Sequence, residues 1–351
     1  MPHQFLFRRS STLESNWPFV PERLLERLQA EGEVIVDESA TSGELSDGLE
    51  LDQVSAVANF AGSLKATELE RMPNLKVIGG VFDNAVTGTE LDVLQLQERG
   101  ISVIDATRGW AQSVAECAFA LALCALRGIP QWHCRMSARE PLWVYEASQF
   151  CDNSNFVNGE LGTKKVGVMG LGQIGRRIAQ WCVAFGADVV GFDPYLPQEL
   201  FEEWQVSKVD LDTLVDSADI VFVAIPPTPS SKGILNRERI GRLKKGGLVT
   251  VITRAHSVDM AALRERILAD EIFGAFDVYD VEPLPVDDPL RNRANVVHTP
   301  HIAGRTRDAN IRVADIIADD FIRIVNGQTP QNALTARATE VRNLESPEIA
   351  G

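Results

Sequence analysis

The stretch Lys164–Gly186, KKVGVMGLGQIGRRIAQWCVAFG, contains three glycines in the spacing G-x-G-x-x-G, namely Gly170, Gly172 and Gly175. An apolar segment precedes them, and apolar residues at helical spacing follow: Ile174, Ile178, Trp181 and Phe185. The pattern predicts a strand, a tight turn and a helix. Glycines at these positions permit the turn, a close backbone approach to a pyrophosphate and helix–strand contact. The helix N-terminus would offer free amides to the anion, so the stretch predicts a dinucleotide site.

A second apolar segment, DVVGFD at residues 188–193, ends in Asp193. A carboxylate at this distance from the glycines accepts hydrogen bonds from an adenosine ribose and repels a 2′-phosphate. NAD is therefore expected rather than NADP. Arg176 and Arg177 could weaken this preference, although helical geometry points at least one of them outward. A plain βαβ glycine turn would explain the glycines but not Asp193.

Helical and strand patterns alternate on both sides of the turn. Strands are expected before it at residues 33–38, 54–60, 75–80 and 101–106, and from it onward at 164–170, 188–193, 219–225, 247–253, 274–280 and 295–301. Strands alternating with helices predict an α/β fold with parallel, doubly wound sheets.

Two long helices are expected to flank the second series of strands. Ser113 and Glu116 have the S-x-x-E spacing of a capping box, and an apolar run continues from them to a helix end near Gly128. Apolar residues recur at helical spacing again from Ile311 to Val325, and Gly327 is a typical residue after a helix end. The polar tail from Thr329 onward is expected to be loosely ordered.

The composition is that of a globular enzyme with two domains. The chain has 351 residues and a formal net charge of −15, which argues against nucleic acid and anionic membranes as partners. The longest apolar run, at residues 117–126, is shorter than the roughly 20 residues of a membrane span and predicts a buried helix. Five cysteines without a C-x-x-C pair indicate reduced, mostly buried thiols and a cytoplasmic protein.

Three polar residues follow predicted strands near the end of the second series. Arg254 comes after LVTVIT, Glu282 after GAFDVYDV, and His301 after NVVHTP. Because the carboxyl ends of parallel strands line the ligand crevice of an open sheet, we expect these side chains to lie together beside the nicotinamide.

These blocks resemble the signatures of the D-isomer-specific 2-hydroxyacid dehydrogenases. The similarity covers LKKGGLVTVITRAHSVDMAAL, GAFDVYDVEPLP and NVVHTPHIAG, together with GLGQIGRRIA, FDPY and IPPTPSSKGILN, and spans residues 166–304. SVAECAFALALCALR resembles the helix before the family's cofactor domain. The resemblance implies a Rossmann NAD-binding domain at residues 129–305, inserted into a flavodoxin-like substrate domain formed by residues 1–128 and 306–351. Closure of the cleft between them would exclude water.

The resemblance also implies roles for the three polar residues. Arg254 would bind the carboxylate and carbonyl oxygen of a 2-keto acid, a task suited to a planar guanidinium. His301 would donate a proton to the carbonyl oxygen as hydride arrives and take it back in reverse. Glu282 would hold the second imidazole nitrogen and favour the imidazolium form. The product would be a D-2-hydroxy acid.

Other residues are assigned through the same resemblance. Asp277 would anchor the nicotinamide carboxamide, and the remaining cofactor contacts would come from Gln173, Ile174, Thr228, Thr253 and Gly304 together with the glycine turn. The block VIGGVFDNAVTG would supply the loop that binds the substrate carboxylate, with Gly79 and Gly80 as candidates. This block departs from the family in length around Asp83, and Ala255 and His256 replace the glycine that usually follows the arginine. A homodimer through the cofactor domain is implied.

Alternatives remain open at this point. A dinucleotide-sensing scaffold, like the corepressors that resemble these dehydrogenases, would use the same fold with little turnover. Formate oxidation needs no acid–base pair, which counts against it here. His298 is expected to be a structural strand residue, and no third ligand supports a metal site with His298 and His301. Trp110 and Trp143 are expected in core packing or a dimer contact rather than in the substrate pocket.

Overall fold

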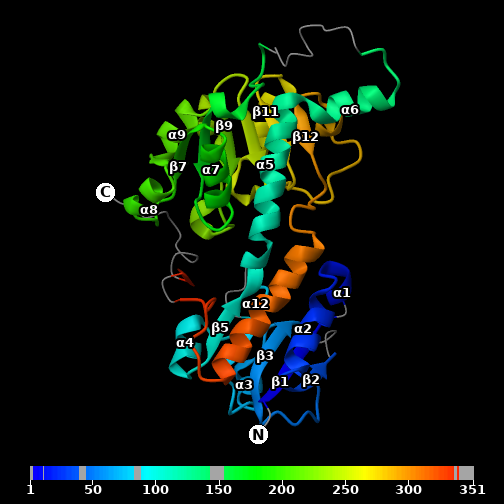
Figure 1. Cartoon of the computed structure of the whole chain (residues 1–351), viewed down its shortest axis with the longest axis vertical. Helices are drawn as coiled ribbons and strands as arrows, with labels where there is room; N and C mark the ends of the chain where they lie inside the picture. The colour runs from blue at the N-terminus through cyan, green and yellow to red at the C-terminus, as the bar shows by residue number, and fades with distance from the viewer. Residues whose placement is uncertain are drawn as a thin grey trace. The chain divides into compact units, whose positions relative to one another are not determined.

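The computed structural model describes residues 3–10, 12–38, 45–82, 88–142, 154–335 and 338–339. The described chain divides into two compact units. The first comprises the residues up to Ala111 and Arg305–Arg342, and the described residues of the second lie within Gln112–Gly304. Figure 1 traces the chain through both units from the N-terminus to the C-terminus.

The first unit contains a five-stranded parallel sheet in the order β2-β1-β3-β4-β5. The strands are β1 (His3–Arg9), β2 (Gly32–Asp37), β3 (Val54–Phe60), β4 (Val77–Gly80) and β5 (Ser102–Asp105). This is the order of flavodoxin-like folds, in which the chain reverses its direction of progress between β1 and β3.

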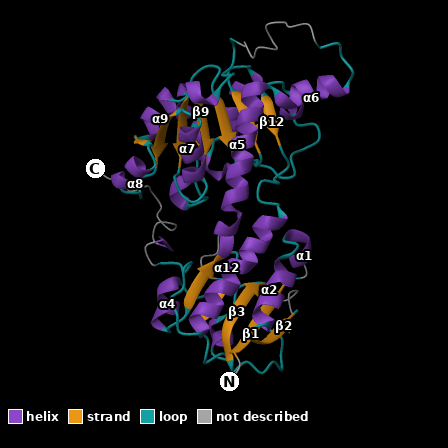
Figure 2. Ribbon diagram, in the orientation of Figure 1, coloured by secondary structure: helices purple, strands orange, loops and turns teal. Residues whose placement is uncertain are grey.

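Helices cover both faces of this sheet (Figure 2). They are α1 (Leu13–Asn16), α2 (Val20–Gln29), α3 (Ala66–Leu69), α4 (Val93–Glu98), the 3-10 helix η1 (Ala106–Trp110) and α12 (Arg307–Val325). Side chains of α2 and α12 share one buried core, and those of α3 and α4 share the other. Successive residues of β3, such as Ala56 and Val57, point alternately into the two cores. Both faces of the strand are therefore covered, and its mostly apolar sequence is interrupted only by Ser55 and Asn59, which are buried as well.

The second unit contains a seven-stranded parallel sheet in the order β12-β11-β10-β9-β6-β7-β8. The strands are β6 (Lys165–Met169), β7 (Asp188–Phe192), β8 (Ser207–Lys208), β9 (Ile220–Val223), β10 (Leu248–Val251), β11 (Phe273–Phe276) and β12 (Val296–His298). Numbered within the unit, this is the Rossmann order 3-2-1-4-5-6 with one additional strand, and the switch point lies between β6 and β9.

The helices of the second unit again form two layers. They are α5 (Ala111–Arg127), α6 (Ile129–Ser137), α7 (Gly175–Ala184), α8 (Gln198–Glu203), α9 (Leu211–Ser217), α10 (Arg237–Arg242) and α11 (Met260–Leu268), with 3-10 helices η3 (Leu161–Thr163), η4 (Pro229–Ser231), η5 (Ala255–Ser257) and η6 (Pro289–Asn292). Buried residues of α5 and α7 pack in one core, and those of α9, α10 and α11 pack in the other. The predicted fold class, two doubly wound parallel sheets with helices, is therefore confirmed.

Two boundaries differ from the sequence prediction. The units divide between Ala111 and Gln112 rather than after residue 128, because α5 packs its apolar side against the second sheet. The helix α5 also begins at Ala111, directly after η1, so Ser113 lies inside the helix and does not cap it. Asp105 caps η1 instead, since its carboxylate accepts a hydrogen bond from the Thr107 amide at 3.1 Å. The predicted helix end is confirmed, because α5 ends at Arg127 and Gly128 adopts φ 60°.

Strand β1 and the contacts at the start of the tail are not apparent from the sequence. Strand β1 is an interior strand of its sheet, with β2 on one side and β3 on the other, although its sequence HQFLFRR has only three consecutive apolar residues. Residues 329–335 of the tail are held against the first unit, because Ala333 bridges to Ile104 at the free edge of β5 and Asp320 accepts hydrogen bonds from two tail amides. The polar composition of the tail did not predict these contacts, because the tail makes them through its backbone groups.

The helical stretch Ala106–Arg127 is long and apolar enough to cross a membrane by length and composition, with a mean hydropathy of 1.4 over its most apolar window. Half of that window is buried inside the structure. Its buried residues Ala118, Leu121, Ala122 and Leu126 belong to the core shared with α7. The prediction of a buried core helix for residues 117–126 is therefore confirmed.

Candidate functional site

The glycine turn between β6 and α7 has a separate physical reason for each glycine. Gly170 adopts φ 83°, a conformation that favours glycine. A Cβ on Gly175 would lie 1.8 Å from the carbonyl oxygen of Gly170, so only glycine lets α7 approach the strand this closely. A Cβ on Gly172 would meet no atom within 4 Å. The open space at Gly172, at the start of a ten-residue helix, fits a turn that admits a pyrophosphate.

The residue after β7 holds this turn in place. The Asp193 carboxylate accepts hydrogen bonds from the amides of Leu171 at 2.9 Å and Tyr195 at 3.1 Å. Asp193 is half-buried, which leaves the carboxylate within reach of a ligand at the turn. Both arginines at the start of α7 donate hydrogen bonds to nearby glutamine side chains. Arg176 donates to the Gln173 side chain at 2.6 Å, and Arg177 donates to Gln112 at 3.0 Å.

The three polar residues that follow late strands lie at one edge of the second sheet. Strands β10, β11 and β12 are neighbours, with Val251, Phe276 and His298 side by side in register. Arg254 follows the first strand, and Glu282 and His301 follow the other two. The topology therefore brings all three to the carboxyl edge, where open parallel sheets bind ligands.

Glu282 and His301 form a hydrogen-bonded pair. One carboxylate oxygen of Glu282 lies 2.6 Å from His301 Nδ1, and the other accepts the Tyr279 amide at 2.9 Å. The side chains are 37% exposed for His301 and 34% exposed for Glu282, so solutes can reach the pair. His301 Nε2 is the ring nitrogen that this contact leaves available for a substrate. The arrangement is that of a general acid–base group oriented by a carboxylate.

The backbone at His301 is held in a conformation that non-glycine residues rarely adopt, with φ 53°. Asp277 holds the surrounding loop in this conformation. Its fully buried carboxylate accepts hydrogen bonds from the Thr299 hydroxyl at 2.6 Å, the Ile302 amide at 2.8 Å and the Ala303 amide at 2.9 Å. Its carbonyl oxygen accepts the His301 amide at 2.9 Å. Asp277 thus positions the histidine loop, a role that sequence reasoning missed.

Arg254 and two residues assigned to the cofactor, Thr228 and Thr253, lie in loops at the same edge. Arg254 is half-buried, and its guanidinium donates to the Thr253 carbonyl at 2.8 Å. The Thr253 hydroxyl donates to Ile225 O at 3.0 Å, which joins two loops. Thr228 is buried, and its carbonyl lies 2.9 Å from Nε2 of the exposed His256. His256 is therefore a loop residue that contacts its neighbour.

The second histidine of the segment, His298, has a structural environment. His298 is a half-buried residue of β12, as predicted, and burial lowers its pKa. No group of three or more metal-ligating side chains occurs within the described part of the chain.

Trp110 donates to Asn310 at 3.1 Å and packs in the first unit's core. Burial raises the pKa of the Cys182 thiol to about 12, whereas Cys134 is exposed. Trp143, Cys151 and Asp83 lie outside the described residues.

Gly79 and Gly80 are both buried in β4. A Cβ on Gly79 would lie 2.6 Å from the ring of Phe321, and one on Gly80 would lie 2.4 Å from Asn59 O. Packing therefore accounts for both glycines. Their proposed contact with a substrate carboxylate remains a prediction.

The glycine turn, the Rossmann strand order and the Glu282–His301 pair are together typical of a class of dinucleotide-dependent oxidoreductases. A family model described as "D-isomer specific 2-hydroxyacid dehydrogenase, NAD binding domain" matches residues 119–303. The chain is 36% identical over 282 residues to a D-3-phosphoglycerate dehydrogenase of Archaeoglobus fulgidus, covering 80% of this chain and 51% of that protein. It is 34% identical over 264 residues to a hydroxypyruvate reductase of Thermotoga maritima, covering 73% and 80%.

A solved structure gives the same result. The crystal structure of a phosphoglycerate oxidoreductase from Rhizobium etli superimposes with a TM-score of 0.80 at 25% identity, covering 95% of this chain and 98% of that one. The chain belongs to the D-isomer-specific 2-hydroxyacid dehydrogenase family, and its second unit is the family's domain for a nicotinamide cofactor. It spans about half the length of the D-3-phosphoglycerate dehydrogenases that it matches.

Proposed function

We propose that this protein transfers hydride between NAD(H) and a small 2-keto acid, forming or oxidising a D-2-hydroxy acid. The observation on which the proposal chiefly rests is the Glu282–His301 pair, 2.6 Å between Oε2 and Nδ1, on the unit that carries the glycine turn. Formate oxidation would leave this pair without a task. The names of the relatives, which act on phosphoglycerate and hydroxypyruvate, support a 2-hydroxy or 2-keto acid substrate.

Each side chain of the set has a task in this reaction. Arg254 would hold the substrate through its carboxylate and carbonyl oxygen, because a guanidinium makes two parallel hydrogen bonds to such a pair of atoms. His301 Nε2 would give a proton to the carbonyl oxygen during reduction and accept it during oxidation. Glu282 would stabilise the imidazolium charge. A bound nicotinamide would supply or accept the hydride, and the glycine turn with Asp193 would hold the cofactor.

The role of Glu282 can be tested by Glu282→Gln, which keeps the shape of the side chain but removes its charge. We expect kcat for keto-acid reduction to fall about 10- to 100-fold, since charge-assisted hydrogen bonds contribute roughly 1.5–3 kcal/mol. Steady-state kinetics measure the change. Glu265→Gln, which removes a carboxylate from the exposed ion pair with Arg237, is the control and should leave kcat unaltered. Equal rates for Glu282→Gln and the wild type would contradict the role.

NAD is the proposed cofactor, and the support for it is the carboxylate of Asp193 at the end of β7. Replacing Asp193 by asparagine keeps an amide oxygen for the Leu171 amide but removes the charge that would repel a 2′-phosphate. We expect the ratio of kcat/KM for NADH over NADPH to fall at least tenfold, because a tenfold change corresponds to about 1.4 kcal/mol and like charges at a binding site cost several kcal/mol. Asp188→Asn, at the opposite end of the same strand, is the control. A ratio that stays constant in Asp193→Asn would argue against this basis for NAD preference.

The proposed function is tested by following NADH absorbance with the purified protein and a panel of 2-keto acids that includes glyoxylate, hydroxypyruvate and a phosphorylated acid. Oxidation of NADH with one acid supports the dehydrogenase and identifies its substrate. Tight NADH binding without turnover of any acid would instead support a dinucleotide-sensing scaffold.

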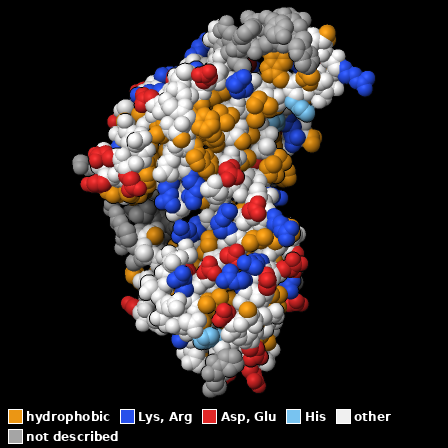
Figure 3. Space-filling model, viewed as in Figure 1, with side chains coloured by type: hydrophobic (Ala, Val, Ile, Leu, Met, Phe, Trp, Pro, Cys, Tyr) orange, Lys and Arg blue, Asp and Glu red, His pale blue; other side chains and the backbone are white. Residues whose placement is uncertain are grey.

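A cytoplasmic homodimer through the cofactor domain is also proposed. Support comes from α6, where Ile129 is 50% and Met136 is 47% exposed, and from the hydrophobic side chains visible over the second unit in Figure 3. Exposed apolar surface of this kind marks association sites. Sedimentation velocity at several protein concentrations would show a dimer.

A further inference from the structure

A row of residues crosses the carboxyl edge of the first sheet in register. Arg8 of β1 pairs with Asp37 of β2 on one side and with Asn59 of β3 on the other. Asn59 pairs in turn with Gly80 of β4. Arg8 and Asn59 therefore face each other between β1 and β3, which is the switch point of this sheet. Doubly wound sheets bind ligands outside the strand ends at such points.

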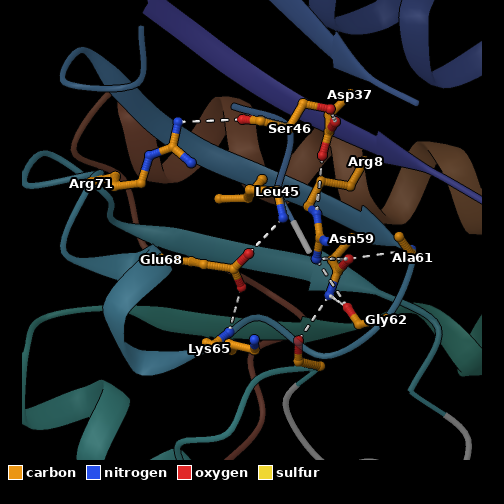
Figure 4. Close-up of polar contacts among 11 residues, drawn as sticks. Arg8, Asp37, Leu45, Ser46, Asn59, Ala61, Gly62, Lys65, Glu68 and Arg71 are labelled. Carbon is orange, nitrogen blue, oxygen red and sulfur yellow. Dashed lines mark hydrogen bonds and ion pairs between the residues drawn. The ribbon is translucent and has the colours of Figure 1, made fainter. Parts of the chain in front are cut away.

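Arg8 is completely buried, and its guanidinium contacts Asp37 and Asn59 of this row as well as Gly62 in the loop after β3 (Figure 4). Its Nη1 donates to Asn59 Oδ1 at 3.2 Å and to Gly62 O at 3.0 Å, and its Nε lies 3.5 Å from the Asp37 carboxylate. Ser46 donates a hydroxyl hydrogen bond to Asp37 at 2.6 Å. Burial of a guanidinium is strongly destabilising unless it is paired and hydrogen-bonded in this way.

Hydrogen bonds from Asn59 connect the row to two loops. Its amide nitrogen donates to Gly62 O at 3.2 Å, in the loop after β3, and to Gly88 O at 2.8 Å, beyond β4. Its amide oxygen accepts the Ala61 amide as well as Arg8. Gly88 O also accepts the Leu64 amide at 3.0 Å. The two loops are thus joined to each other and to the switch point through one buried side chain that is 3% exposed.

We propose that Asn59, held by Arg8, is a positioning residue that fixes the loop after β3 and the backbone at Gly88 for binding of the 2-keto acid. The inference rests on the proposed function. It assigns Asn59 no contact with the substrate. Its effect is exerted through the backbone of the two loops, so the substrate's KM is the quantity that depends on it.

The second unit provides a matched control. Asn295 is 2% exposed, donates its amide to Ile267 O at 2.8 Å and Ile272 O at 3.0 Å, and accepts Arg293 at its oxygen. Its contacts thus copy those of Asn59, but they lie at the amino end of β12, the edge away from the ligand-binding ends of the strands. Asn59→Asp and Asn295→Asp each remove two buried amide donors and keep the acceptor for an arginine.

The experiment measures kcat, KM for the keto acid, the NADH dissociation constant and the melting temperature of both variants. We expect both melting temperatures to fall, while only Asn59→Asp raises KM about tenfold, with kcat within about threefold of the wild type and NADH affinity preserved. An unchanged KM in folded Asn59→Asp, or an equal rise in both variants, would overturn the positioning role.

If Asn59→Asp does not fold, Ser46→Ala takes its place, because it removes only the hydroxyl donor to Asp37. A raised KM in Ser46→Ala supports the role, and an unaltered KM overturns it. Lack of any keto-acid turnover by the wild-type protein would overturn the proposed function and this inference together. Keto-acid turnover by the wild type, together with a normal KM in Asn59→Asp or in its replacement Ser46→Ala, would overturn the inference alone.

Discussion

Replacing His301 by asparagine is expected to lower kcat for keto-acid reduction about 10³-fold, because the reaction loses the group that delivers the proton. Asparagine is the suitable replacement, since His301 has φ 53° and asparagine tolerates this left-handed conformation better than other polar residues. The loop held by Asp277 should therefore keep its backbone. The loss of rate then reports the imidazole rather than a distorted loop.

The measurement combines single-turnover kinetics with NADH binding followed by fluorescence. NADH affinity should stay within about threefold of the wild type, because the removed ring is assigned to the substrate and not to the cofactor. His298→Asn is the matched control, as it removes the other histidine of the same segment from β12. A His301→Asn protein with wild-type kcat would refute the acid–base assignment, and a large loss in His298→Asn would transfer that role to His298.

The second large effect concerns the glycine turn, where two alanine substitutions should fail in different ways. In Gly175→Ala the new Cβ would lie 1.8 Å from Gly170 O, so α7 must move away from the strand. We expect a destabilisation of about 1–3 kcal/mol, a lower melting temperature and loss of cofactor binding. The clash is with backbone, which no side-chain rotation can relieve.

Gly172→Ala should preserve the melting temperature, because its Cβ would meet no atom within 4 Å. The same methyl group would occupy the space through which a pyrophosphate approaches the backbone. We therefore expect NADH affinity to fall at least tenfold in a protein of wild-type stability. Differential scanning fluorimetry and calorimetric titration separate the two effects. Wild-type NADH affinity in Gly172→Ala would contradict the placement of the pyrophosphate at this turn.

Local sequence patterns determined much of the fold. The strand β9 is continuously apolar and β3 is mostly apolar, because both faces of each strand are covered. The alternation of such strands with helical patterns leaves only parallel, doubly wound sheets. The glycine turn was predictable because each glycine answers a backbone requirement within the same few residues. Asp193, Glu282 and His301 could be selected because each follows a recognisable strand.

The tertiary structure decided what depends on partners distant in the chain. Nothing local marks HQFLFRR as an interior strand of the first sheet, because Arg8 is buried beside Asp37 and Asn59, which the sheet brings to its two sides. The 2.6 Å contact of Glu282 with His301 and the loop contacts of Asp277 likewise join different strand ends. Helix α5 begins at Ala111, earlier than predicted, because it continues directly from a 3-10 helix. It belongs to the second unit because its buried residues pack in that unit's core. Sequence periodicity records burial and local backbone geometry, whereas buried charges and paired polar groups are specified by neighbours that only the folded chain assembles.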